Sequence, residues 1–143
     1  MSVWEILKAK GTDVITVDEY NSVEHATNLM RQRKIGALVV RSGGKIAGIL
    51  THREVSEGYA QFGVRLEMLT AGDLALRDFT SVAPNESTKQ LISLMTRHRL
   101  THVPVLESGR LVGIVSIGDV LRLRLVDLEL EASVLRDVYI APH

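Results

Sequence analysis

Residues 48–55 read GILTHREV, and residues 113–120 read GIVSIGDV, two copies of one pattern. Each copy ends a longer segment. Residues 13–55, DVITVDEYNSVEHATNLMRQRKIGALVVRSGGKIAGILTHREV, align without a gap on residues 78–120, DFTSVAPNESTKQLISLMTRHRLTHVPVLESGRLVGIVSIGDV. Ten of the 43 columns are identical, whereas unrelated segments of average composition match at roughly one column in sixteen. The chain therefore contains a tandem duplication.

Both repeats predict the same order of elements, β-α-β-β-α. A short β-rich run leads to Ser22 or Ser87, each a good N-cap for the helix that follows. Two strands joined by a Gly-bearing loop come next, and a second helix begins at Thr51 or Ser116. One such unit of about 50 residues buries too little apolar surface to be stable alone. We therefore expect an α/β (α+β) fold in which two units pack with pseudo-two-fold symmetry.

The expected domain organisation has four parts. Residues 1–62 form repeat one with its N-terminal helix, 63–77 a connector, 78–125 repeat two, and 126–143 a C-terminal helical extension. The chain between the two duplicated segments, residues 56–77, contains expected breaks at Gly58, Gly63 and Gly72. Its TAGDLA (70–75) resembles SVWEIL (2–7), and both predict a short capped helix entering a repeat.

A long helix is predicted from Ser116 to about Tyr139. Its apolar residues follow alternating spacings of four and three, the pattern of a heptad seam: Leu121, Leu125, Leu128, Ala132, Leu135 and Tyr139. A second apolar stripe is formed by Leu123, Val126, Leu130 and Val134. Two stripes are more than one small domain can cover, so we predict a homodimer through this helix.

Composition excludes several classes of protein. Seventeen basic residues balance seventeen acidic ones, which argues against a nucleic-acid binder. No Cys is present, so there is no disulfide framework and no thiolate site. The start, MSVWEILKAKG, lacks the apolar region of a signal peptide, and no apolar run approaches the ~20 residues of a membrane span. We expect a cytoplasmic protein that does not associate with membranes.

Catalytic and metal sites are not predicted. The sequence lacks the GxSxG, Walker A and HExxH motifs, so we expect neither an enzyme nor a catalytic cofactor. His98 and His102 have a spacing that could hold a metal ion on a helix. However, residues 100–102 should already be leaving the helix, and no acid or Cys accompanies them.

The T-x-x-E and S-x-x-D pairs, Thr51 with Glu54 and Ser116 with Asp119, have two readings. Each can be a capping box, in which the hydroxyl accepts from an early amide and the acid accepts from the cap amide. Each can also bind a ligand, because the helix start follows the carboxyl end of a strand. Free amides and a positive dipole there favour a phosphate.

On these residues and the duplication, the chain resembles the CBS domain in its tandem form, the Bateman module, over residues 2–125. The resemblance implies a regulatory module that binds an adenosine-containing nucleotide in the cleft between the repeats. AMP, ATP, NAD(H) and S-adenosylmethionine all fit this class. Binding would shift the population of module conformations, and a separate, unknown effector protein would detect that shift.

The resemblance also implies roles for individual residues. In the family the acid of the signature binds the ribose hydroxyls, and the hydroxyl residue lies beside the ribose or phosphate. Those roles would belong to Asp119 and Ser116 in one site, and to Glu54 and Thr51 in the other. The residues implied to line the adenine are Ile15, Ile35 and Ala37 in site one, and Thr80, Leu100 and His102 in site two. The phosphate candidates are His52, Arg53 and Arg99.

Departures from the family pattern predict that the two sites differ. Repeat one has Glu54 where an Asp is usual, and Val39 where repeat two has Pro104. Repeat two has Ile117 and Gly118 in place of two basic residues, so its own helix start supplies no phosphate cation. The alternative function is a dimeric interaction scaffold that binds no ligand.

Overall fold

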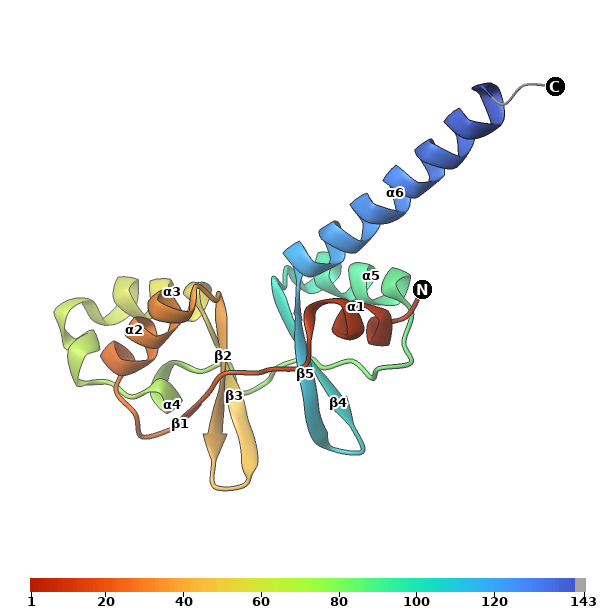
Figure 1. Cartoon of the computed structure of the whole chain (residues 1–143). Coiled ribbons are helices and arrows are strands. Elements are labelled where there is room, and N and C mark those ends of the chain that lie inside the picture. The colour runs from red at the N-terminus through yellow and green to blue at the C-terminus, as the bar shows by residue number, and fades with distance from the viewer. Residues whose placement is uncertain (141–143) are drawn as a thin grey trace. The chain divides into compact units, whose positions relative to one another are not determined.

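The computed structural model describes the backbone of residues 1–140 and the side chains of residues 1–138 (Figure 1). The chain divides into two compact units. The first-repeat unit comprises Asp13–Ser81. The second-repeat unit comprises Met1–Thr12 together with the chain from Val82 onward. Two repeat-based units are thus confirmed, although the N-terminus joins the second rather than the first.

The first-repeat unit is a three-stranded sheet with helices. Its elements are β1 (Thr16–Asp18), α2 (Val23–Arg33), β2 (Ala37–Ser42), β3 (Lys45–Thr51), α3 (His52–Phe62), the 3-10 helix η1 (Gly63–Met68) and α4 (Ala71–Leu74). Strand β1 is parallel to β2, and β2 is antiparallel to β3. The buried core is Val17, Ala26, Met30, Leu38, Val40, Leu50 and Ala71. The expected β-α-β-β-α order is confirmed here.

The second-repeat unit is built around a two-stranded hairpin. Its elements are α1 (Val3–Lys10), α5 (Thr88–His98), β4 (His102–Glu107), β5 (Arg110–Ser116) and α6 (Ile117–Ile140). Strands β4 and β5 are antiparallel, as expected from the Gly-bearing loop. The buried core is Val3, Ile6, Leu7, Val82, Leu91, Met95, Val103, Val105, Val115 and Val120.

The first strand predicted in repeat two is reduced to a single bridge between Val82 and Val105. Two prolines explain the loss. In repeat one the Val39 amide donates to Ile15 O at 3.1 Å, and the Glu19 amide donates to Arg41 O at 2.8 Å. The aligned residues of repeat two are Pro104 and Pro84, which have no amide hydrogen to donate.

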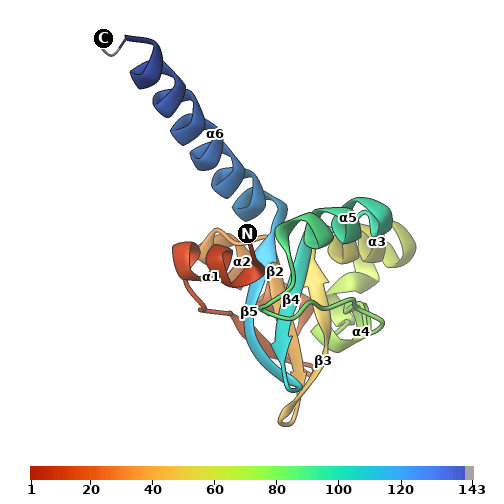
Figure 2. The ribbon, with the colours of Figure 1, turned by 90° about the vertical axis from the view of Figure 1, so that its right-hand side faces the viewer.

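Helix α1 packs against the hairpin of repeat two (Figure 2), not on repeat one, to which the sequence pattern assigned it. Val3, Ile6 and Leu7 are at most 2% exposed and belong to that core. Helix α4 shows the reciprocal arrangement, because its Ala71 is fully buried in the first-repeat unit. Each lead-in helix therefore completes the core of the repeat that it does not directly precede.

The capping predictions were right at Ser22, Thr70 and Ser87 and wrong at Ser2. Ser22 Oγ accepts from the His25 amide at 3.0 Å. Capping boxes form at Thr70 with Asp73 and at Ser87 with Gln90. Ser2 precedes α1 but makes no side-chain cap bond. The first amides of α1 donate instead to backbone carbonyls of a neighbouring loop: Val3 N to Glu86 O at 2.8 Å, and Trp4 N to Pro84 O at 2.9 Å. A tertiary contact thus replaces the local cap.

Gly58 does not break the chain, contrary to the sequence-based expectation. It lies buried inside α3, where a Cβ would approach Leu74 Cδ2 to 2.7 Å. The missing side chain lets α4 pack closely on α3.

Helix α6 is the long helix that the sequence predicts, and it spans 24 residues. Leu123 near its start packs against the second-repeat core, while most later apolar residues are exposed. The side chain of Tyr139, the last residue of the predicted seam, lies outside the described residues. No described helix combines the length and the apolar character that crossing a bilayer requires.

Candidate functional site

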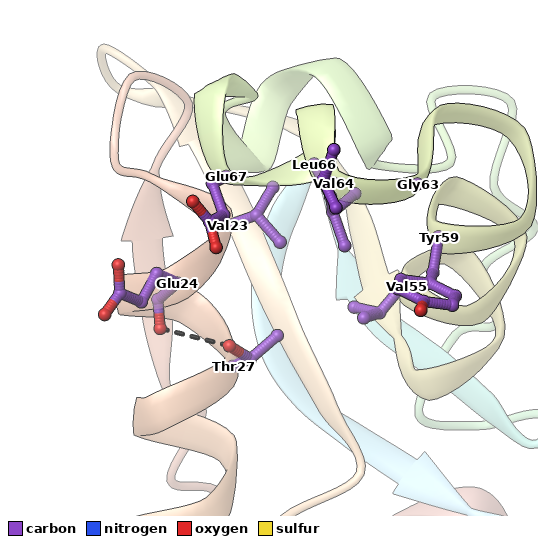
Figure 3. A pocket seen from close by; sticks show the side chains of 9 residues that line it. All are labelled: Val23, Glu24, Thr27, Val55, Tyr59, Gly63, Val64, Leu66 and Glu67. Carbon is purple, nitrogen blue, oxygen red and sulfur yellow. Dashed lines mark hydrogen bonds between the residues drawn. The ribbon is translucent and has the colours of Figure 1, made fainter.

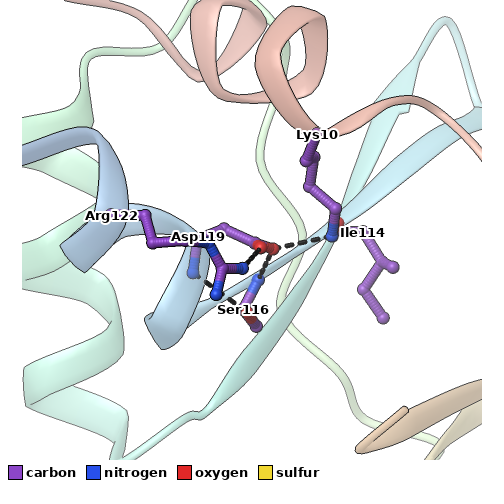
Figure 4. A network of polar contacts seen from close by, with 5 residues as sticks. All are labelled: Lys10, Ile114, Ser116, Asp119 and Arg122. Atoms are coloured by element: carbon purple, nitrogen blue, oxygen red, sulfur yellow. Dashed lines mark hydrogen bonds and ion pairs between the residues drawn. The ribbon is translucent and has the colours of Figure 1, made fainter. Parts of the chain in front are cut away.

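Asp119 is the centre of a polar network in the second-repeat unit (Figure 4). Its side chain is only 6% exposed. One carboxylate oxygen, Oδ2, accepts from the Ser116 amide at 2.8 Å and from Lys10 Nζ at 2.6 Å. The other, Oδ1, accepts from Arg122 Nη2 at 2.6 Å. The Asp119 amide donates to Ser116 Oγ at 3.1 Å, which completes a capping box.

The ionised form of Asp119 is favoured. Burial raises the pKa of this carboxyl group, because a low-dielectric surrounding penalises the charge. The hydrogen bond and the charge of Lys10, together with the hydrogen bonds from Ser116, outweigh the burial and leave the pKa below its ordinary value. Asp119 is therefore a carboxylate at neutral pH, even though it is nearly enclosed.

A cavity of about 260 Å³ opens beside this network. It lies between α1 and α6, and its lining residues are Ile6, Ala9, Lys10, Asp119, Arg122, Leu123 and Val126. Two cations and one carboxylate share the cavity with aliphatic walls. The formal charge of its ionised groups is therefore positive, which suits an anionic ligand that also carries hydroxyl groups.

Lys10 and Arg122 are absent from the sequence-based list of site residues. Lys10 is 109 positions from Asp119, and it reaches the carboxylate only because α1 packs on repeat two. Its Nζ also donates to Ile114 O at 2.6 Å, which holds the lysine against β5. A local signal did exist for Arg122, because it lies three positions after Asp119 on the same helix face.

The equivalent pair in the first-repeat unit, Thr51 with Glu54, is a capping box. Glu54 Oε1 accepts from the Thr51 amide at 2.8 Å and from Thr51 Oγ1 at 2.7 Å. The neighbouring Arg53 pairs with Glu57 at 3.2 Å. Both acids of the duplicated signature are thus caps, and Asp119 also holds ion pairs with Lys10 and Arg122.

Sequence alignment explains this difference between the repeats. Glu57 occupies the position of Arg122, so an acid replaces a cation on the same helix face. Helix α4 ends at Leu74, after four residues, whereas α1 continues for eight residues to Lys10. The shorter lead-in helix supplies no counterpart of that lysine. The sites were predicted to be inequivalent. In the structure they differ in the charged side chains that surround the acid.

The residues predicted for site one lie within the first-repeat unit. Ala37 and Thr51 are paired across β2 and β3, and the Ile15 carbonyl accepts from the Val39 amide beside them. Ile35 is half-buried against the core. His52 and Arg53 are exposed in the first turn of α3. The sheet thus brings the predicted adenine residues near the helix start.

The residues predicted for site two are divided between the units. His102 pairs with Ser116 across β4 and β5, and Leu100 is half-buried against the core. Arg99 ends α5 with a φ of 54°. Thr80 belongs to the first-repeat unit. His102 is thus the predicted adenine residue that the hairpin places beside the Ser116 cap.

The glycines of the signature, Gly48 and Gly113, make room for protein groups. A Cβ at Gly48 would lie 2.7 Å from the Leu76 carbonyl oxygen, and one at Gly113 would lie 2.7 Å from Leu7 Cδ2. Another protein group therefore approaches the backbone closely at each of these glycines. The approaching groups come from the α4 region and from α1, so these glycines are explained by packing.

A second cavity, of about 570 Å³, lies among α2, α3 and η1 (Figure 3). Its apolar lining includes Val23, Val55 and Tyr59, with Glu24 and Glu67 at its edge. None of the predicted site residues lines it. Among the residues that the structure describes, no three His, Asp or Glu side chains lie close enough together to hold a metal ion.

Comparison with known proteins identifies the family. The model of the CBS domain matches residues 5–60 and 71–126, both repeats. The chain belongs to the CBS domain family. The two CBS domains coincide with the duplicated segments, which confirms the tandem pair predicted from the repeat.

Several relatives of this CBS-domain chain are known. It is 31% identical over 108 residues to the CBS domain-containing protein YhcV of Bacillus subtilis, covering 76% of each chain. It is 38% identical over 109 residues to inosine-5'-monophosphate dehydrogenase of Korarchaeum cryptofilum. That match covers 76% of the present chain and 22% of the dehydrogenase, so the chain spans about a fifth of that enzyme.

Solved structures of CBS-domain proteins share the fold. A CBS-domain protein of Agrobacterium tumefaciens is 37% identical with a TM-score of 0.84, covering 87% of this chain and 99% of that one. The CBS domain pair of protein MJ0100, in complex with 5'-methylthioadenosine and S-adenosyl-L-methionine, is 24% identical with a TM-score of 0.77. That likeness covers 89% of this chain and 98% of the other.

Proposed function

We propose that this CBS-domain pair is a regulatory module that binds an adenosine-containing nucleotide and signals binding to a separate effector protein. The observation that carries the proposal is the Asp119 site. A buried carboxylate at a helix start faces a cavity together with two cations. The module performs no catalysis in this proposal, and it acts as a homodimer.

The chemistry of the site fits the parts of a nucleotide. Ribose hydroxyls can donate to the Asp119 carboxylate in charge-assisted hydrogen bonds. Lys10 and Arg122 supply cations for a phosphate, and the aliphatic walls suit the apolar faces of a ring. Lys10 and Arg122 thus provide the phosphate cations that the first two residues of α6, Ile117 and Gly118, do not supply.

A bound nucleotide competes with Lys10 and Arg122 for the Asp119 carboxylate. Lys10 and Arg122 already occupy both oxygens of Asp119, so a ribose must share or displace these bonds. Lys10 is the last residue of α1, and its contact with Asp119 ties the end of that helix to the start of α6. A nucleotide that binds Lys10 in place of Asp119 changes this contact between α1 and α6. The change at α1 is the signal that we propose the effector detects.

The ligands of MJ0100 support the class of ligand. Both contain adenosine, although 24% identity to that protein shows only that the fold is shared. AMP, ATP, NAD(H) and S-adenosylmethionine all remain within the proposed class. The Thr51–Glu54 site is proposed to bind more weakly or to prefer a different member, because Glu57 stands where the other site has Arg122.

One observation favours a second candidate, a dimeric scaffold without a ligand. The capping box and the ion pairs already satisfy the Asp119 carboxylate, so the fold needs no ligand to accommodate a buried charge. In this alternative the network is a structural link between α1 and α6.

Calorimetric titration with AMP, ATP, NAD and S-adenosylmethionine separates the two functions. We expect wild-type protein to bind at least one of the four. Asp119→Ala should lower that affinity by at least about tenfold, since each charge-assisted bond is worth roughly 1.5–3 kcal/mol. Asp119→Asn should fall between the two, because the amide keeps one acceptor but loses the charge.

Asp73→Ala is the matched control. Asp73 is also the acid of a capping box, but it is exposed and has no basic partner among the described residues. Its loss should lower stability without changing affinity. If wild-type protein binds none of the four nucleotides, the scaffold is the better explanation. If Asp119→Ala folds and binds as wild type does, the proposed role of this residue is wrong.

A further inference from the structure

Most of helix α6 has no partner within the described chain. Leu121, Leu125, Leu128 and Leu135 are each between 53% and 60% exposed. Leucines rarely form so long an exposed row unless another surface covers it. The regular spacing of four and three residues is that of a helix that pairs with another helix.

The row faces away from the protein's own core. Leu123 packs against the second-repeat core, and Val126 lines the cavity beside α1. These two residues share one face of α6, since residues three or four apart lie together on a helix. The row of Leu121, Leu125 and Leu128 lies on the opposite face. A partner helix can therefore approach the row without meeting α1.

The pattern assigns conventional heptad letters to this face. The d positions are Leu121, Leu128 and Leu135, and the a positions are Leu125 and Ala132. Leucine at d occurs in two-stranded parallel coiled coils, whose a positions usually hold Ile or Val where this helix has Leu125 and Ala132. The flanking g positions hold Arg124 and Glu131, and the flanking e positions hold Arg122, Glu129 and Arg136.

These flanking charges favour one orientation. In a parallel pair, a g residue faces the e residue of the following heptad in the partner. Arg124 then faces the partner's Glu129, and Glu131 faces the partner's Arg136. Both contacts are attractive, and two-fold symmetry repeats each of them. Within the described residues, these four side chains make no ion pair of their own.

An antiparallel pair makes fewer favourable contacts between these charged side chains. One antiparallel register places Arg124 opposite the partner's Glu131 and Arg122 opposite the partner's Glu129. Arg122, however, is already bound to Asp119 at 2.6 Å. The same register leaves Leu135 beyond the paired layers. A register that buries Leu135 instead brings Arg122 toward the partner's Arg136, which is repulsive.

We infer that α6 pairs with α6 of a second copy as a parallel, in-register, two-stranded coiled coil. The parallel pair covers the whole row and leaves the Arg122–Asp119 contact intact. This inference goes beyond the proposed function, because it names the surface and the orientation of the pair. It does not depend on whether a nucleotide binds.

Cysteine cross-linking tests the orientation directly, because the chain contains no Cys. In a parallel pair, a Cys at position 135 faces its own copy within the about 4.4–6.8 Å between Cα atoms that a disulfide needs. In the two antiparallel registers, the same residues lie about 15 Å or more apart along the axis. We expect oxidised Leu135→Cys to run mostly as a covalent dimer on a non-reducing gel.

Asp137→Cys is the matched control. It is two residues away, exposed, and on the face opposite the row. It should give little covalent dimer under the same conditions. Since Leu135 is itself exposed, its replacement should leave the fold intact. Equal cross-linking of the two variants, or none in Leu135→Cys, would overturn the parallel pair.

Charge exchange gives an independent test by sedimentation equilibrium. Arg124→Glu should raise the dissociation constant of the dimer about fivefold, because two attractive contacts become repulsive. Adding Glu129→Arg in the same chain should restore it. Rescue by Glu131→Arg in place of Glu129→Arg would indicate the antiparallel register. A monomer in the wild type at micromolar concentration would contradict the pairing altogether.

Discussion

Asp119 combines two roles that elsewhere in the chain belong to different residues. As the N3 residue of a capping box it resembles Glu54, Asp73 and Gln90. As the acceptor of bonds from Lys10 and Arg122 it also holds two elements together. A buried carboxylate needs such partners, because an unpaired charge in a low-dielectric surrounding is costly. The two roles predict that its charge contributes to stability.

That contribution should depend on pH. The folded-state pKa of Asp119 lies below its ordinary value, so the ionised group stabilises the fold above the unfolded pKa of about 3.9. The stabilisation is lost as pH falls through the lower, folded pKa. We expect Asp119→Asn to unfold at lower urea concentration than wild type near neutral pH. The gap should narrow below about pH 4; a constant gap would contradict this assignment.

At the scale of elements, the two repeats differ where two backbone amide hydrogens are missing. Strand β1 pairs with β2 through three residue pairs, whereas its counterpart in repeat two is one bridge, because Pro84 and Pro104 donate no hydrogen bond. The starts of α1 and α5 also differ in which groups accept from their first backbone amides. Ser87 caps α5 with its side chain, but Ser2 does not cap α1, whose first amides bond to a loop.

The two serines provide a matched test of capping. Ser87→Ala should lower the free energy of unfolding by about 1 kcal/mol, because the Gln90 amide loses its acceptor. Ser2→Ala should change it little, since the Ser2 hydroxyl makes no cap bond. Chemical denaturation of both variants measures the difference. Equal losses would mean that α1 is capped in solution by Ser2 after all.

At the scale of the whole molecule, the lead-in helices are exchanged between the repeats. Helix α1 contributes three buried residues to the second-repeat core, and α4 contributes Ala71 to the first. Contacts between segments far apart in the sequence thus make each unit stable. They also bring Lys10 to Asp119, so the candidate site exists only because of the exchange.

Leu7→Ala tests this arrangement. Leu7 is fully buried in the second-repeat core, so its truncation should lower the stability of that unit by roughly 2–5 kcal/mol. In hydrogen exchange, amides of residues 82–120 should lose more protection than those of residues 13–81. Lys8→Ala, an exposed change on the same helix, is the control. Greater loss in residues 13–55 would place α1 on repeat one.

The sequence by itself determined the features that depend on neighbouring residues. Hydrophobic periodicity and turn residues predicted the tandem repeat, the strand hairpins and the long final helix, because these patterns act over a few positions. The capping pairs at Thr51 and Ser116 were likewise readable, since a cap and its acid lie three residues apart. The charges beside the α6 row belong to the same class of local signal.

Only the tertiary structure decided how the lead-in helices are distributed and what surrounds Asp119. An apolar face such as Val3, Ile6 and Leu7 fits either repeat, and no local pattern states which core it completes. The choice follows from packing over the whole chain, where each core gains a close-fitting helix. Lys10 and Asp119 are 109 positions apart, and their contact is a consequence of that packing.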